Sequence, residues 1–194
     1  MREIEKSLEA LSQNNISYFT QAFPNKEHWR ILSHFKNDLS YFDIETSGLS
    51  FYDSEISVIS CYHQNEMRTY VNGDDLDDFL DLLENIKCLV SFNGASFDVP
   101  FVQETFNIPT FPCPHIDLRW VCYHKGMKGT LKEIEKDCGV YRSESITGVD
   151  GYEAVLLWEK YKRFGVSKAL EKLIEYCEAD VEALVEVTNE VLMR

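Results

Sequence analysis

Apolar and polar residues follow one another along the first half of the chain in the manner of a β-sheet. Residues 39–45 form an apolar, β-prone run that ends in acidic residues and is followed by a strand-breaking Thr-Ser-Gly. Residues 55–63 alternate between apolar and polar side chains, and residues 67–71 are again rich in β-formers, with a link short enough for a hairpin. Residues 88–93 have the pattern of a buried strand, and residues 114–118 that of a fifth, short strand.

The other segments have the spacing of helices. Residues 74–84 place their apolar side chains on one face, which leaves a row of aspartates for solvent. Residues 94–106 begin with small residues and then become helical, because Pro100 is tolerated in a first turn. Three amphipathic helices are expected near the C-terminus, at residues 130–139, 151–164 and 168–193.

These elements predict an α/β fold with a mixed β-sheet flanked by helices. We expect two parts: an N-terminal helical extension, residues 1–37, packed on a domain formed by residues 38–194. The length of 194 residues fits one domain with a sizeable core, or one domain plus a short extension. The 44% of hydrophobic residues argues against a disordered chain.

Composition also bears on the location of the protein. No apolar run is long enough for a membrane helix, and the N-terminus has no apolar segment typical of a signal peptide. Six cysteines include no C-x-x-C pair, so we expect buried free thiols in a reducing compartment rather than a zinc site. The sequence therefore predicts a cytoplasmic protein with no membrane partner.

The net charge of −14 argues against a broad basic surface for nucleic acid. Residues 113–170 are the exception, with ten Lys and Arg against eight Asp and Glu. Basic side chains there are either phosphate contacts along a single strand or scattered helix-face charges, and the sequence leaves both open: Arg119, Lys125, Lys128, Lys132 and Arg142.

Two acids end the first predicted strand. Asp43 and Glu45 lie two residues apart, so strand geometry points both side chains to the same face. Neighbouring carboxylates repel each other, and a divalent cation with its preference for oxygen ligands would offset that charge. The alternative is a strand that simply exits to solvent with two surface acids.

Two further acids have equally simple alternatives when taken one at a time. Asp98 lies at a predicted helix start, where an acid can merely complement the helix dipole. Asp180 lies on the last helix, four residues after Tyr176 and therefore on the same face, although this helix carries many solvent-facing glutamates.

The order of these acids along the chain resembles a known family. Residues 42–49 (FDIETSGL), 91–98 (SFNGASFD) and 176–180 (YCEAD) are similar to the three exonuclease motifs of DnaQ-like DEDD nucleases. Tyrosine four residues before the last aspartate is typical of the DEDDy subtype. Further segments resemble its YprB-like subgroup, and the resemblance covers roughly residues 20–190: FPNKEHWRILSHF, PHIDLRW, TLKEIEKDCGV and ITGVDGYEAVLLWEKY.

The resemblance implies a ribonuclease-H-like fold, a mixed sheet of about five strands flanked by helices, and a 3′–5′ exonuclease. It implies that Asp43, Glu45, Asp98 and Asp180 hold two divalent metal ions, Mg²⁺ or Mn²⁺, with Asp43 between them. Tyr176 would orient the attacking water rather than remove its proton. The contacts to the 3′-terminal nucleotide implied by the resemblance are Thr46, Gly48, Leu49, Asn93 and Phe97, although Phe97 fits a core position equally well.

The implied substrate is a DNA or RNA 3′ end, expected to be single-stranded. The alternative is a non-catalytic or partner-dependent nucleic-acid-binding module of the same fold, and a protein partner such as a helicase could supply affinity. A haloacid-type phosphatase would require Asp-x-Asp, from which Glu45 departs, and no G-x-S-x-G turn of a serine hydrolase is present. We read Asp117, a fifth acid nearby, as structural.

Overall fold

The computed structural model describes residues 2–194, of Arg2 the backbone only, and its centre is one five-stranded mixed β-sheet. The strands lie in the order β3-β2-β1-β4-β5. The pairs β3–β2 and β2–β1 are antiparallel, whereas β1–β4 and β4–β5 are parallel. The strand bounds are β1 Leu39–Thr46, β2 Ile56–His63, β3 Glu66–Val71, β4 Cys88–Ser91 and β5 His115–Asp117. This sheet confirms the predicted α/β class and its five strands.

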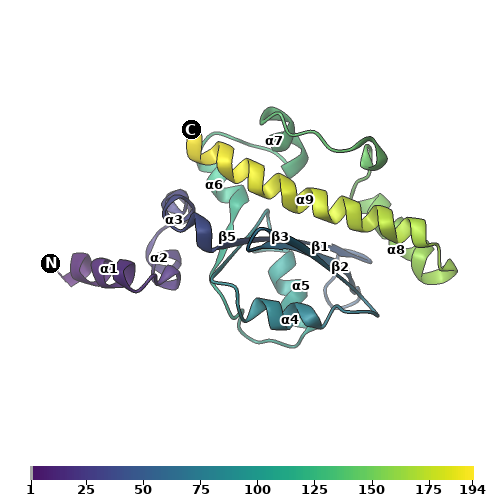
Figure 1. Ribbon diagram of the computed structural model, residues 1–194, viewed down its shortest axis with the longest axis horizontal. Helices are drawn as coiled ribbons and strands as arrows, with labels where there is room; N and C mark the ends of the chain where they lie inside the picture. Colours follow the sequence, from purple (N-terminus) through teal and green to yellow (C-terminus); the bar gives the residue numbers. More distant parts are fainter. Residues whose placement is uncertain (1) are drawn as a thin grey trace.

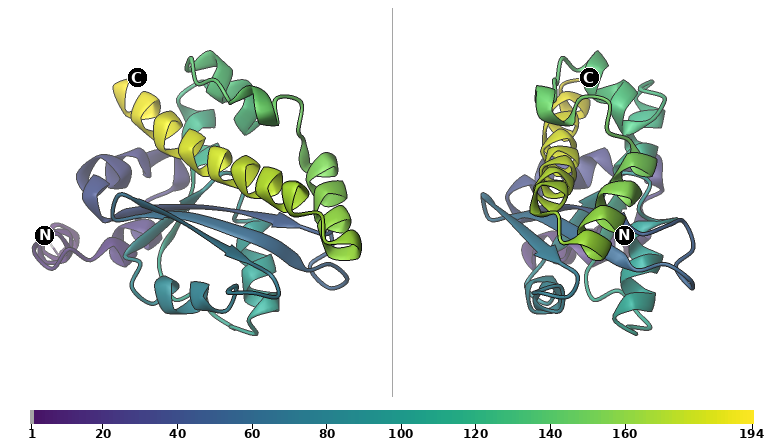
Figure 2. Two further views of the ribbon diagram at one scale, coloured as in Figure 1. Left: turned by 45° about the vertical axis from the view of Figure 1, so that its right-hand side comes forward. Right: turned by 90° about the vertical axis from the view of Figure 1, so that its right-hand side faces the viewer.

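Helices cover both faces of the sheet. The short helices α4 and α5 lie on one face, while the long helix α9 crosses the other face beside α6, α7 and α8 (Figures 1 and 2). Their bounds are α4 Asp78–Leu83, α5 Asp98–Thr105, α6 Leu118–His124, α7 Leu131–Asp137, α8 Gly151–Phe164 and α9 Ser167–Met193. Each helix except α6 was expected as a separate element from its spacing.

Local chemistry explains several of these boundaries. The β2–β3 hairpin turns through Gln64 and Asn65, both with positive φ, as two-residue hairpin loops require. Helix α7 begins at a capping box, in which the Thr130 side chain and Glu133 each bond the other's backbone N–H. Helix α8 ends at Gly165 in the left-handed conformation, where a glycine carries no Cβ penalty.

The acidic helix is shorter than predicted. We expected it over residues 74–84, but α4 begins only at Asp78. The preceding residues form turns, in which the carboxylate of Asp75 accepts a hydrogen bond from the backbone N–H of Val71 at 2.8 Å. Asp side chains favour such local bonds to the backbone over a helical conformation.

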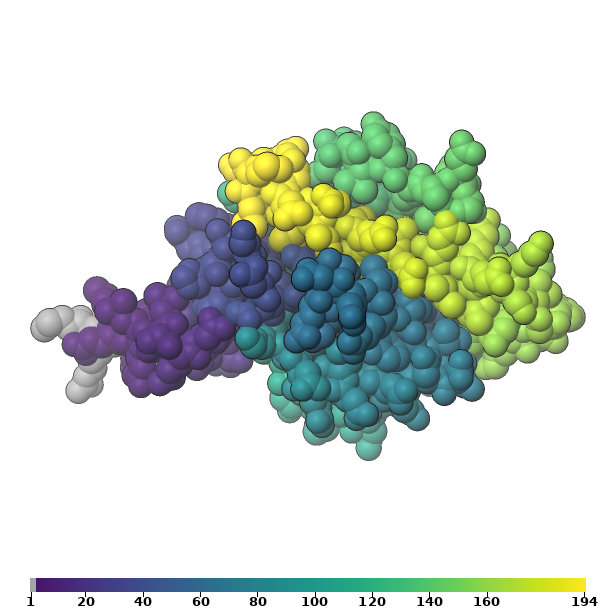
Figure 3. Space-filling model, viewed as in Figure 1, coloured from purple at the N-terminus to yellow at the C-terminus, as the bar shows by residue number. Residues whose placement is uncertain are grey.

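The segment before the sheet is helical, as expected. It contains α1 Arg2–Ser12, α2 Ile16–Ala22 and α3 Trp29–His34. The 3₁₀ turn Asn25–Glu27 lies between α2 and α3, and the 3₁₀ turn Lys36–Asp38 joins α3 to β1. Helices α1 and α2 project from one end of the molecule (Figure 3). Buried side chains of this segment share one core with α6 and α9, namely Ile16, Phe19, Ile31 and Leu32. The division into an extension and a domain at residue 38 stays a prediction.

The cysteines are free thiols, as expected. All six cysteines are free, and five of them are buried. Among residues 2–194, no helix is both long and apolar enough to cross a membrane.

Candidate metal centre

Strand alternation on β1 decides where the first two acids point. Phe42 and Ile44 join the core beneath α4 and α5, whereas Tyr41 joins the core on the side of α9. Because successive side chains alternate between faces, Asp43 and Glu45 lie on the α9 side with Tyr41. The apolar residues of β1 therefore hold both carboxylates against α9.

Helix α9 brings a third acid to the same point. Asp180 is 7% exposed, and one oxygen of each carboxyl of Asp43, Glu45 and Asp180 lies within 4.8 Å of the others. We call these three residues the acidic cluster. Tyr176 lies one helical turn before Asp180 on the same face and is 5% exposed.

Asp98 lies next to the acidic cluster at the first residue of α5. It is 4% exposed, and its charge raises the pKa of both Asp43 and Glu45, which places it beside the two acids of β1. Gly94 makes room for it: a Cβ there would lie 1.9 Å from Oγ of Ser91 and 3.1 Å from an oxygen of Asp98. The structure thus gathers all four acids predicted to bind metal, three of them within ligand distance of one another.

Burial and mutual repulsion make these carboxyls hard to ionise without a cation. Burial raises the pKa of Asp43 and of Glu45 well above their ordinary values, and the charge of Asp180 raises both further. Burial also raises the pKa of Asp98, to about 7. For Asp180, burial raises the pKa while Arg142 opposes the shift. A buried cluster of this kind stays charged only next to a positive charge.

One basic side chain is bonded to the acidic cluster, and a second lies beside Tyr176. Arg142 forms a salt bridge with Asp180 and another with Glu135 at 2.7 Å. Nζ of Lys132 lies 4.7 Å from the ring centroid of Tyr176 and donates to the backbone oxygen of Val149. The sequence left Arg142 either as a phosphate contact or as a scattered surface charge, but its side chain is only 11% exposed and is held in these ion pairs.

The surroundings of Tyr176 keep its phenol protonated. Burial raises the pKa of its phenol, and the carboxylates of Asp180 and Glu45 raise it further. The ring also lies beside the guanidinium of Arg142, at 5.4 Å from the centroid. In the metal-free protein the phenol therefore stays protonated at neutral pH and can donate a hydrogen bond.

The predicted substrate contacts after β1 differ in exposure. Leu49 is 88% exposed, so its side chain is free for an apolar contact. Thr46 is buried, and its hydroxyl donates to the backbone oxygen of Gly48 at 2.6 Å. A Cβ on Gly48 would lie 2.6 Å from Oγ of Ser54, so a larger residue there would require the Ser54 hydroxyl to move.

The second pair of predicted contacts lies in the loop after β4. Asn93 has a positive φ of 67° and accepts a hydrogen bond from Arg119 at 2.6 Å. Phe97 is partly buried, with its ring centroid 4.8 Å from that of Phe101, so part of it belongs to the core. Asp117 accepts from the backbone of Asn93 at 2.8 Å, which agrees with a structural role in shaping this loop.

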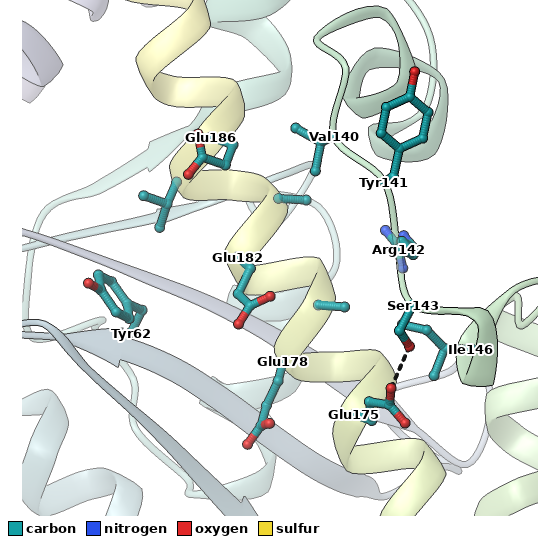
Figure 4. Close-up of a pocket in the computed structure, with 13 residues that line it drawn as sticks. Tyr62, Val140, Tyr141, Arg142, Ser143, Ile146, Glu175, Glu178, Glu182 and Glu186 are labelled. Carbon is teal, nitrogen blue, oxygen red and sulfur yellow. Dashed lines mark hydrogen bonds between the residues drawn. The ribbon is translucent and has the colours of Figure 1, made fainter.

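Two surface hollows lie near the acidic cluster without including it. One, of about 570 Å³, is lined among others by Asn93, Arg119, Tyr123 and Lys128; we call it the α6 hollow. The other, of about 470 Å³, lies along the solvent side of α9 and is lined by glutamates and by the loop that carries Arg142 (Figure 4). The first combines positive charge with an aromatic ring, whereas the second is acidic.

The residues of the acidic cluster fit a divalent metal ion. Their donors are carboxylate oxygens, which hard cations such as Mg²⁺ and Mn²⁺ prefer. Three such oxygens lie within 4.8 Å of one another, close enough to converge on one ion. The buried charge of this group is also larger than the one guanidinium bonded to it can neutralise.

Comparisons with known proteins agree with the fold. A model of the RNase_H superfamily matches residues 40–192. The chain is also similar to the family B DNA polymerase from the hyperthermophilic archaeon Pyrobaculum calidifontis, with a TM-score of 0.63 and 14% identity. That match covers 79% of this chain and only 24% of the polymerase chain. No curated protein matches the chain.

The match to the polymerase establishes the fold, and the match to the superfamily model establishes the family. At 14% identity, the likeness to the polymerase shows a shared fold and nothing of its activity. The superfamily model, by contrast, spans residues 40–192, which include the five strands and the last helix except for Leu39 and Met193 at their ends. The chain therefore belongs to the RNase_H superfamily.

Proposed function

We propose that this protein is a metal-dependent 3′–5′ exonuclease of the DEDDy type, similar to the YprB-like subgroup, that hydrolyses phosphodiester bonds of DNA or RNA. The observation that carries the proposal is the acidic cluster, with Tyr176 one turn from Asp180 and Asp98 beside the two acids of β1. Sequence motifs far apart in the chain thus meet at one point of an RNase H-like fold. A fold of this kind also occurs in the similar DNA polymerase, which supports a nucleic-acid substrate.

Four carboxylates would hold two divalent ions, Mg²⁺ or Mn²⁺: Asp43, Glu45, Asp98 and Asp180. When bound, such ions activate a water and stabilise the charge on the attacking and leaving oxygens of a phosphodiester. The strand and helix fix the carboxylates before substrate arrives, so little reorganisation is needed.

Tyr176 would orient the attacking water. Its phenol stays protonated because burial and neighbouring carboxylates raise its pKa, so its O–H donates to an oxygen rather than accepting a proton. Helix α9 carries Tyr176 and Asp180 on one face, one turn apart, so the helix itself fixes the position of the hydroxyl relative to Asp180.

The 3′-terminal nucleotide would lie against the turn after β1. Leu49, with 88% of its side chain exposed, would contact the sugar or base, and the backbone around Gly48 would approach closely. Thr46 would shape that turn through its bond to Gly48. Asn93 and Phe97 would border the nucleotide from the second motif.

The preceding nucleotides would follow the α6 hollow. Arg119 bonds Asn93 and therefore lies next to the second motif, and Lys128 lies 5.2 Å from the ring centroid of Tyr123. Tyr123 is 48% exposed, so its ring is open to a stacked base. Basic and aromatic side chains in one groove are the combination that single-stranded nucleic acid requires.

The acidic balance of the chain favours weak binding by the protein alone. With a net charge of −14, few phosphates can be neutralised, and a shallow salt dependence follows. A protein partner such as a helicase could supply the missing affinity. A non-catalytic, partner-dependent module of the same fold is the alternative that this charge supports.

Digestion of 5′-labelled single-stranded DNA and RNA oligonucleotides tests the proposal. We expect shortening with Mn²⁺ or Mg²⁺, none with EDTA, and none for Asp43→Asn. The matched control Asp75→Asn removes one acid from the turn before α4 and should keep full activity. A folded wild-type protein that binds Mn²⁺ but cleaves neither strand would favour the non-catalytic alternative.

A further inference from the structure

Arg142 lies between two buried carboxylates, Glu135 on α7 and Asp180 on α9. Its Nε and Nη2 donate to the two oxygens of Glu135, each at 2.7 Å. The same Nη2 also donates to Oδ1 of Asp180. The side chain of Arg142 is 11% exposed and that of Glu135 3%, so water barely reaches this contact.

The loop that carries Arg142 is fixed at both ends. The backbone N–H of Val140 donates to the backbone oxygen of Glu135 at 2.8 Å. On the other side, Oγ of Ser143 donates to Glu175 of α9 at 2.5 Å, as the dashed line in Figure 4 shows. The guanidinium is thus placed by its backbone as well as by its partners, unlike a surface arginine.

Arg142 and Lys132, two cations near the acidic cluster, have different hydrogen-bond partners. Within residues 2–194, it forms the only salt bridge to a member of the acidic cluster. Lys132 instead donates to a backbone oxygen. The Nη1 of Arg142 is buried and has no hydrogen-bond partner in the described part of the chain, so two carboxylates alone bond the guanidinium.

This arrangement has consequences for Asp180 as a metal ligand. The hydrogen bond from Arg142 takes one lone pair of Oδ1 and draws on its charge, which leaves Oδ2 as the stronger donor for a cation. An arginine does not lose its proton in proteins, so the bond persists at any working pH. The guanidinium and a metal ion therefore draw on the charge of the same carboxylate, while Glu135 keeps the guanidinium in place.

We propose that Arg142, held by Glu135, is a positioning residue that fixes Asp180 as a one-oxygen ligand and weakens the affinity of the acidic cluster for its metal ion. The inference rests on the proposed function, because it takes Asp180 to be a metal ligand. Arg142 acts through Asp180 and touches neither the ion nor the substrate. Its presence lowers the affinity for the metal ion and, at the same time, fixes the geometry of Asp180 as a ligand.

Calorimetric titration of the whole chain with Mn²⁺, without substrate, tests this inference. The variant Arg142→Met/Glu135→Gln removes the ion pair without changing the net charge and with little change in volume. We expect its Kd for Mn²⁺ to fall about tenfold, because a charged hydrogen bond no longer competes for Asp180. Its cleavage rate at saturating Mn²⁺ should fall, because Asp180 loses its support.

The matched control is Arg68→Met/Glu66→Gln, which removes an exposed Arg–Glu pair from β3. Its Kd and rate should equal those of wild type. If the double variant at Arg142 and Glu135 does not fold, Arg142→Lys replaces it, because lysine keeps the charge but cannot bond two carboxylates in a fork. We expect a Kd close to that of wild type with a reduced rate at saturation.

A Kd that stays equal or rises in the double variant would overturn the inference, as would an unchanged rate in Arg142→Lys. The proposed function fails in a different way. Wild type could bind Mn²⁺, lose that binding with Asp43→Asn, and still cleave no oligonucleotide. The exonuclease proposal would then be wrong, while the change in Kd for Mn²⁺ would still decide the role of Arg142. If wild type binds no Mn²⁺, both fall.

Discussion

Cys177 of α9 is in direct contact with Asp43 of β1: its Sγ lies 3.5 Å from the backbone oxygen of Asp43 and 3.9 Å from Oδ2. The cysteine is fully buried, and its short side chain fills the space between the helix and the strand at this point. The distance between Asp180 and the acids of β1 is therefore set by how closely α9 packs on the sheet.

A larger side chain at this contact should separate the acids. We expect Cys177→Leu to lower the cleavage rate by about 10²-fold, the effect of a misplacement near 1 Å. Overpacking should also cost about 1–3 kcal/mol of unfolding free energy in urea. The control Cys177→Ser keeps the size and should retain most of the rate. A Cys177→Leu variant with the wild-type rate would contradict this packing argument.

Removing the charge of Asp43 should stabilise the metal-free protein while abolishing activity. The carboxylate of Asp43 is repelled by its neighbours and poorly solvated, whereas a neutral amide of the same size escapes that repulsion but is a weaker metal ligand. We expect Asp43→Asn to raise the Tm measured in EDTA. Each kcal/mol of repulsion that the substitution removes should raise Tm by about 2–4 °C. Thermal unfolding with and without Mn²⁺ measures this. A lower Tm for the variant in EDTA would contradict the electrostatic account.

Loss of the Tyr176 hydroxyl should slow the chemical step and leave metal binding intact. We expect Tyr176→Phe to reduce the single-turnover rate by about 10²-fold, as for other oriented donors. The Kd for Mn²⁺ should stay the same, because the phenol is not a ligand. The control is Tyr123→Phe in the α6 hollow, which keeps its ring. Equal rates for Tyr176→Phe and wild type would exclude the water-orienting role.

Basic side chains of the α6 hollow should affect binding rather than chemistry. We expect Arg119→Ala and Lys128→Ala each to raise KM and to reduce the salt dependence of binding by about one phosphate contact. The maximal rate should change little. Fluorescence anisotropy with a labelled oligonucleotide at several salt concentrations measures this, with Arg163→Ala on α8 as control. Unchanged KM in both variants would place the strand elsewhere.

His115 should make the folding stability depend on pH. Burial lowers its pKa to about 4, and its Nε2 lies 2.8 Å from Oγ of Ser91. Because the unfolded chain takes up a proton at about pH 6.5 and the folded protein does not, the contribution of His115 to stability should fall between about pH 6.5 and 4. The raised pKa values of Asp43, Glu45 and Asp98 act in the opposite direction, so the contribution of His115 is read from the difference between wild type and a variant. The variant His115→Gln should show a smaller decline in urea unfolding across this window. An identical decline would show that other groups cause it.

The sequence predicted those parts of the molecule that depend on local patterns. The alternation around Asp43 and the spacing of Tyr176 and Asp180 follow from strand and helix geometry, so the face of each side chain was predictable. Their meeting was implied by family resemblance. The salt bridge between Arg142 and Asp180 was not predictable, because it joins a loop to a helix 38 residues away. The hydrogen bond from the backbone N–H of Val71 to the Asp75 carboxylate was not predictable from the apolar spacing either. With this bond in place, α4 begins only at Asp78.

The most direct test of the central claim is the direction of cleavage. One single-stranded oligonucleotide is labelled either at its 5′ end or at its 3′ end and digested with Mn²⁺, beside Asp43→Asn. Our account predicts a ladder that shortens gradually from the 5′-labelled strand, and release of a labelled mononucleotide at the earliest times from the 3′-labelled strand, with neither product for the variant. Internal fragments from both labels, or equal products from Asp43→Asn, would contradict it.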